Sequence, residues 1–76
     1  MKLLSEILHE IRPEYDFSAS RDFIAEGMLD SFDVVTLVSA LEKHYSIVIP
    51  GKDIVPENFQ NSQTIHALLS HHGVSL

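Results

Sequence analysis

The sequence contains no cysteine and no tryptophan, and only five of its 76 residues are lysine or arginine. The absence of cysteine excludes disulfide bonds, cysteine-ligated zinc and a thiol nucleophile, and it is typical of a reducing compartment. Eleven aspartate and glutamate residues give a formal net charge of −6, which disfavours binding to nucleic acid. The acidity favours basic protein partners, although a negative surface also serves simply to keep a small protein soluble.

Long hydrophobic runs are also missing. No stretch approaches the roughly 20 apolar residues that a membrane-spanning helix needs. Glu6, His9 and Glu10 interrupt the apolar start of the chain before the hydrophobic region of a signal peptide is complete. We therefore expect a cytoplasmic protein that is not embedded in a membrane.

The short length allows only one hydrophobic core, so we expect a single domain over residues 1–76, and a monomer. The starting methionine and the lack of flanking Pro- or Ser-rich segments favour a free-standing protein over a domain cut from a multidomain synthetase.

Apolar residues at helical spacing predict four helices, whereas no pair of alternating runs predicts a sheet. The fold class is therefore all-α, a four-helix bundle with a long first loop and a short third helix. The helices are expected at 2–12, where Pro13 stops the first, at 31–45, at about 56–59, and from a cap at Ser62 or Thr64 to Gly73.

The first connection, from Pro13 to about Asp30, has no helical periodicity but is too apolar for a solvated linker. We expect it to pack over the core, and because long loops often carry function, a site is expected at its end, near Gly27 to Asp30. Its apolar residues are Tyr15, Phe17, Phe23, Ile24, Met28 and Leu29.

The helix at 31–45 has two apolar lines. Phe32 and Val35 lie on a second line that continues to Ser39 and should be partly exposed, as in a partner-binding surface. The alternative is that Phe32 folds back against the long loop. The line expected to face the core consists of Val34, Leu37, Val38, Leu41 and Tyr45.

Ser31 lies at the start of this helix, where either Asp30 or Ser31 is expected to be the N-cap. The segment Gly27-Met28-Leu29-Asp30-Ser31-Phe32-Asp33 resembles the Asp-Ser-(Leu/Met/Phe) modification site of acyl, peptidyl and D-alanyl carrier proteins. The resemblance continues through the helix to Tyr45, the Ile47-Val48-Ile49-Pro50 connector, Asp53-Ile54 and the Pro56-Glu57-Asn58-Phe59 turn, and it covers nearly the full chain.

The resemblance implies the carrier-protein bundle and a 4′-phosphopantetheine arm, moved from coenzyme A to the Ser31 hydroxyl by a phosphopantetheinyl transferase. An acyl or aminoacyl cargo would be held as a thioester on the arm. Further partners would be an adenylating ligase and a downstream acyltransferase or synthase, and the chain itself would not be an enzyme. The residues that would dock these partners are Asp30, Phe32, Asp33, Val35 and Glu42.

Physical chemistry both supports and opposes a phosphodiester on Ser31. The positive end of the helix dipole and the free N–H groups of the first turn would attract it. The like charges of Asp30 and Asp33 oppose that attraction, although water and salt screen them.

The sequence departs from fatty-acid carriers along the second helix, where Thr36, Ser39 and Lys43 make the expected docking face less acidic and less apolar. This favours a dedicated partner such as an adenylating ligase over general fatty-acid synthesis. The segment at 53–59 is similar to stand-alone carriers of amino acids or unusual acyl groups, including D-alanyl carriers.

Three other readings compete with the carrier. A hydrolase using Ser31 and a histidine lacks the G-x-S-x-G turn and room for a substrate pocket. A metal site at His66, His71 and His72 lacks the i, i+4 spacing that places two imidazoles on one helix face. The third is a four-helix interaction module that keeps the scaffold but is never modified.

Overall fold

The structure is a computed structural model that describes residues 3–75. Those residues form only helices and connecting segments, which confirms the all-α prediction. The α-helices are α1 (Leu4–Ile11), α2 (Ser31–Tyr45) and α3 (Ser62–His71), and the 3-10 helices are η1 (Phe17–Ala19), η2 (Gly51–Asp53) and η3 (Pro56–Phe59). The short third helix expected at Pro56 is thus the 3-10 helix η3, while η1 and η2 lie in segments that were expected to be irregular.

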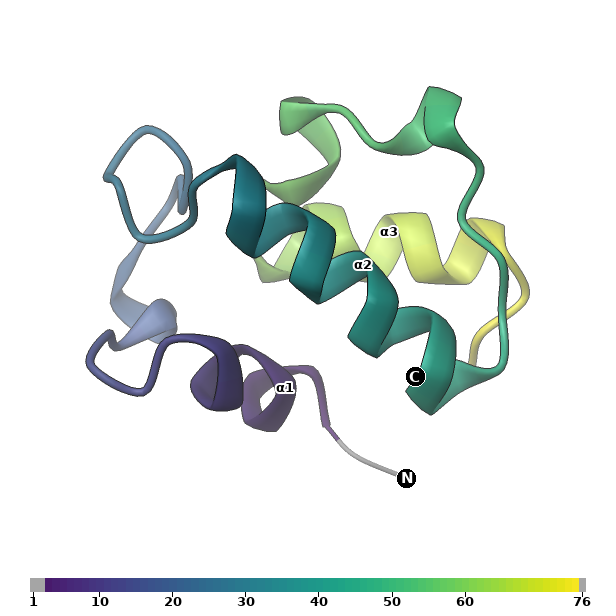
Figure 1. Cartoon of the computed structure of the whole chain (residues 1–76), viewed down its shortest axis with the longest axis horizontal. Coiled ribbons are helices and arrows are strands. Elements are labelled where there is room, and N and C mark those ends of the chain that lie inside the picture. The colour runs from purple at the N-terminus through teal and green to yellow at the C-terminus, as the bar shows by residue number, and fades with distance from the viewer. Residues whose placement is uncertain (1–2, 76) are drawn as a thin grey trace.

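Figure 1 shows α2 crossing the middle of the molecule, with α1 and α3 on different sides of it. After α2 the chain returns toward the start of α2 before α3 begins, so the long first loop and the start of α3 lie at the same end. Two hydrogen bonds join them there. The Phe23 N–H donates to the Gln60 carbonyl, and the Asn61 side-chain amide donates to the Arg21 carbonyl.

One hydrophobic cluster holds the helices and the long loop together. Each α-helix contributes residues spaced three or four apart, as an amphipathic helix should, and full burial of one such aliphatic side chain stabilises the fold by about 1.5–3 kcal/mol. The helical members are Leu4, Ile7, Leu8, Leu37, Val38, Leu41, Ile65, Leu68 and Leu69. Val34 and Tyr45, also expected to face the core, are partly buried against it.

The long loop packs over the core as predicted. Phe17, Phe23, Met28 and Leu29 are buried, and the Phe17 and Phe23 rings meet edge to face with centroids 4.9 Å apart. Tyr15 is the exception, since it is exposed. Burial of four large side chains fixes the loop that leads into α2.

The ends of α1 and α3 refine the sequence predictions. Of the predicted first helix, the start at Lys2 lies outside the described residues, and the helix described ends at Ile11, two residues before Pro13. The expected cap of α3 at Ser62 or Thr64 was wrong, because Asn61 is the N-cap. Its side chain accepts from the Thr64 N–H at 2.9 Å while the Thr64 hydroxyl accepts from the Asn61 N–H at 3.1 Å, a reciprocal capping box.

The connector after α2 forms no strand, as predicted, and two side chains fasten it. A Glu42 carboxylate oxygen accepts from the Ile49 N–H at 2.9 Å. His72 Nε2 and an Asp53 carboxylate oxygen lie 3.1 Å apart and join the end of α3 to η2. The connector therefore has a defined path beside the helices.

Candidate functional site

Ser31 is the first residue of α2, and its side chain is exposed. The N-cap is Asp30, whose carboxylate accepts from the Asp33 N–H at 2.9 Å, while the Asp33 carboxylate accepts from the Asp30 N–H at 3.1 Å. Because Asp30 performs the capping, Ser31 is not needed for it. Within residues 3–75 the Ser31 hydroxyl makes no hydrogen bond, so it is available for chemistry.

The backbone around Ser31 suits an anionic substituent. The N–H groups of Ser31 and Phe32 have no hydrogen-bond partner among the described residues, as is usual for the first turn of a helix. They lie at the positive end of a helix of 15 residues. A phosphodiester on the Ser31 oxygen would therefore find unpaired donors and a favourable dipole nearby.

The structure adds a residue that the sequence interpretation missed, Arg12 at the end of α1. Its Nε donates to Asp33 Oδ2 at 2.9 Å, and its other nitrogens lie 3.5 Å from an Asp30 oxygen and 3.3 Å from a Glu14 oxygen. The guanidinium thus offsets part of the negative charge that Asp30 and Asp33 place beside Ser31. The only sequence signal was an arginine ending a predicted helix before Pro13, and its partner lies 21 residues away.

These contacts alter the acid–base properties of the Arg12–Asp33 pair. Partial burial alone would raise the pKa of Asp33. The hydrogen bond from the Asp30 N–H and the Arg12 guanidinium outweigh that effect, so the pKa lies below its ordinary value. The hydrogen bond to Asp33, together with its charge, raises the pKa of Arg12. Both shifts favour the ionised pair.

The residues predicted to dock partners fall into two groups. Phe32 is 83% exposed and Val35 62% exposed, so Phe32 does not fold back onto the long loop, and Asp30 is also exposed. Asp33 and Glu42 are partly buried and make the contacts with Arg12 and with the Ile49 N–H described above. The surface at the start of α2 thus exposes one acidic and two apolar side chains.

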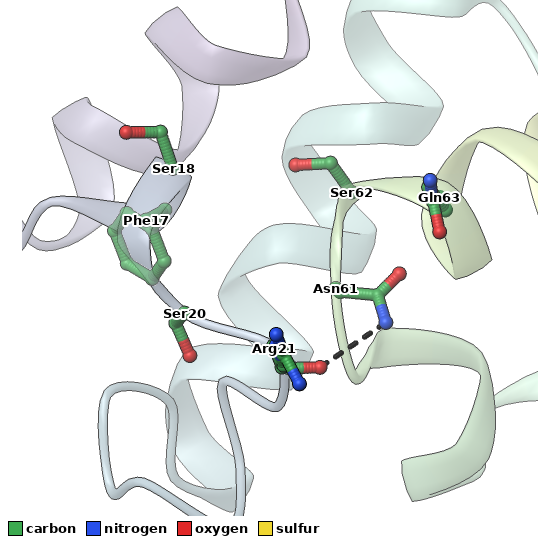
Figure 2. A pocket seen from close by; sticks show the side chains of 7 residues that line it. All are labelled: Phe17, Ser18, Ser20, Arg21, Asn61, Ser62 and Gln63. Carbon is green, nitrogen blue, oxygen red and sulfur yellow. Dashed lines mark hydrogen bonds between the residues drawn. The ribbon is translucent and has the colours of Figure 1, made fainter.

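A groove of about 620 Å³ lies between the long loop and the start of α3 (Figure 2). The Asn61 amide crosses to the Arg21 carbonyl at 3.1 Å, shown as the dashed line in Figure 2. The residues that line the groove are Phe17, Ser18, Ser20, Arg21, Asn61, Ser62 and Gln63. None of them belongs to the predicted site.

The histidines lie apart from Ser31 in the contacts that the structure describes. His66 and His71 are exposed, and His72 contacts Asp53. In residues 3–75 no three histidine, aspartate or glutamate side chains are grouped so that they could hold a metal ion. Over the same residues, no helix is both long and apolar enough to cross a bilayer.

Comparisons with known proteins identify the family to which this helical chain belongs. The family model of the phosphopantetheine attachment site matches residues 1–71. The chain is 30% identical over 69 residues to aminoacyl carrier protein 1 of Bradyrhizobium diazoefficiens, an alignment that covers 91% of this chain and 76% of that protein. No solved structure matches the chain. The chain therefore belongs to the phosphopantetheine-binding carrier proteins, and its function is that of a carrier bearing a phosphopantetheine arm.

Proposed function

We propose that Ser31 is the residue that bears the arm. The observation that carries this proposal is an exposed hydroxyl without a hydrogen bond in the described residues, at the start of α2, where Asp30 already caps the helix. In the transfer, the Ser31 oxygen bonds to the pantetheine-side phosphorus of coenzyme A. The bond from that phosphorus to adenosine 3′,5′-bisphosphate breaks, and the serine proton passes to a base of the transferase.

The chain acts as a single carrier domain over residues 1–76, in the cytoplasm, and it does not catalyse the chemistry of its cargo. The matched relative is named an aminoacyl carrier protein, which supports an amino acid as cargo, held as a thioester on the thiol of the arm. The partners are then a phosphopantetheinyl transferase, an adenylating ligase and a downstream acyltransferase or synthase. A ligase of this kind supplies the activated carboxyl group that a thiol needs for thioester formation.

Partners dock against the exposed start of α2. Asp30 offers a charge to basic residues of a partner, and Phe32 and Val35 offer apolar area that would be buried on binding. Asp33 and Glu42 contribute through the shape and charge of the same helix, since both also hold intramolecular contacts.

Intact-mass spectrometry tests the attachment. The chain is incubated with coenzyme A, Mg²⁺ and a broad-specificity phosphopantetheinyl transferase, and we expect it to gain the mass of one phosphopantetheinyl group. Ser31→Ala should gain nothing. Ser39→Ala is the matched control, because Ser39 is an exposed serine on the same helix, and it should gain as much as the wild type.

Two results would contradict the proposal. An equal gain on Ser31→Ala would place the arm elsewhere. No gain on the wild type, with a known carrier modified in a parallel reaction, would favour an unmodified interaction module that uses the exposed Phe32 and Val35.

A further inference from the structure

We propose that Arg12 is a positioning residue for the loading of Ser31, an inference that rests on the proposed function of that serine. Arg12 is the C-cap residue of α1 and contacts both acids that flank Ser31 in the capping box. It does so from a different helix. The start of α2 is therefore held from outside as well as by its own cap.

The base from which Arg12 reaches is itself fixed. Its backbone N–H donates to the Leu8 carbonyl at 3.0 Å, and Leu8 is buried in the core. Pro13 follows and disfavours a helical backbone at Arg12, and the Arg12 backbone lies outside the helical region, with φ −137° and ψ 80°. The guanidinium thus extends toward α2 from a residue whose backbone is hydrogen-bonded to the end of α1.

One oxygen atom carries the coupling to Ser31. Asp33 Oδ2 accepts both from Arg12 Nε at 2.9 Å and from the Asp30 N–H at 3.1 Å. The Asp33 side chain is only 13% exposed, so solvent competes weakly for this oxygen. Arg12 therefore orients the carboxylate that holds the backbone of Asp30, the residue directly before Ser31.

Charge gives Arg12 a second effect on the same step. Three carboxylates, from Asp30, Asp33 and Glu14, surround one guanidinium, so three negative charges and one positive charge leave a local net charge of −2. Loading adds a phosphodiester at Ser31 and brings the polyanion coenzyme A close to it. Without Arg12 the local charge would be −3, and repulsion of the incoming phosphates would increase.

Arg12 lies 3.5 Å from the docking residue Asp30 but makes its shortest contact, 2.9 Å, with Asp33, so both effects act more on the reacting geometry than on the docking face formed by Asp30, Phe32 and Val35. We therefore expect the loss of Arg12 to lower kcat for transfer to Ser31 and to leave KM for the carrier nearly unchanged. A merely structural role would reduce the fraction of folded carrier. Because the carrier is the substrate of the transferase, this would raise the apparent KM for the carrier and leave the kcat of the transferase unaltered. The split between kcat and KM thus distinguishes positioning from stability and from docking.

The experiment measures steady-state loading by a broad-specificity phosphopantetheinyl transferase, with coenzyme A, on the full chain. Arg12→Gln is compared with Arg12→Lys and with the control Glu14→Gln, which removes the Arg12 partner that does not flank Ser31. Circular dichroism identifies a temperature at which all the variants are folded, and the assays are run at that temperature. We expect kcat to fall about tenfold in Arg12→Gln, with KM within about twofold. Glu14→Gln lowers the local negative charge from −2 to −1 and leaves the Arg12–Asp33 contact in place, so its kcat should not fall below that of the wild type.

Arg12→Lys keeps the test valid if Arg12→Gln does not fold. Lysine retains the charge but lacks the planar fork that reaches two carboxylates, so kcat should fall by about threefold. The inference would be overturned by an unchanged kcat in a folded Arg12→Gln or in Arg12→Lys, or by a change confined to KM. An equal loss of kcat in Glu14→Gln would also overturn it. A wild-type chain that is not loaded at all would instead refute the proposed function of Ser31.

Discussion

The two ends of α2 differ in how their polar groups are used. At its start, Ser31 has an exposed hydroxyl with no hydrogen bond among the described residues. It lies beside the capping box of Asp30 and Asp33, which Arg12 contacts. At its other end, the Glu42 carboxylate is bound to the Ile49 N–H. One end therefore presents an exposed hydroxyl, and the other holds the path of the chain after the helix.

This difference explains how so small a protein could offer a fixed attachment point at the proposed residue, Ser31. Asp30 caps the helix, Arg12 fastens the cap to α1, and the buried loop residues fix the approach to it. The Ser31 hydroxyl, which we propose bears the arm, takes no part in these contacts. Changes in the core should thus affect stability, whereas changes at Ser31 should affect only loading.

The largest expected effect comes from the core side of α2. Leu41 is completely buried, and Leu41→Ala should lower the free energy of unfolding by about 3 kcal/mol through lost burial and a cavity. Urea unfolding followed by circular dichroism measures this. Ser31→Ala is the comparison and should change stability by less than about 0.5 kcal/mol. A comparable loss in Ser31→Ala would contradict the separation of roles within α2.

A smaller effect should appear at acid pH. Because the folded-state pKa of Asp33 lies below its ordinary value of 3.8, its contribution is fully present above the unfolded pKa and is lost as pH falls through the folded one. Unfolding free energy should therefore decline below about pH 4, and loss of this capping interaction should account for about 1 kcal/mol.

Asp33→Asn tests that assignment because it keeps the shape of the side chain but does not titrate. The variant should be less stable than the wild type at neutral pH, and the difference should shrink toward about pH 3. Urea midpoints at a series of pH values measure it. A difference that stays constant over that range would mean that the ionised Asp33 carboxylate does not stabilise the fold.

Much of this arrangement follows from local sequence. The spacing of Leu37, Val38 and Leu41 predicts the buried side of α2, which the structure confirms. The segment around Asp30 and Ser31 indicates the proposed site in the same way, because both patterns depend on residues close together in the chain. The exposure of Phe32 follows from the same periodicity. Local pattern is sufficient wherever one helix decides the outcome.

Other features depend on contacts between distant segments. Arg12 meets Asp33 only after α1 has packed beside α2, and no spacing rule relates two residues across a long loop. The cap of α3 was assigned to Ser62 or Thr64 although Asn61 performs it, since several adjacent residues had suitable side chains. Side chains with similar propensity for the N-cap position are distinguished only by the backbone conformation at each residue.

The smallest expected effect lies at the C-terminal end of α2. Ser46 ends the helix in the left-handed region, with φ 56° and ψ 47°, a conformation that costs a residue with a β-carbon about 1 kcal/mol or more. Ser46→Gly removes that cost but adds freedom to the unfolded chain, so a net gain of about 0.5 kcal/mol is expected. Ser39→Gly, the same replacement inside α2, should instead lose about 0.5 kcal/mol. Thermal unfolding of both variants measures the two stability changes. If both variants are destabilised alike, the strain at Ser46 is too small to matter. If Ser46→Gly is stabilised while Ser39→Gly is destabilised, and Ser46→Gly is loaded at Ser31 like the wild type, the two ends of α2 can be altered independently.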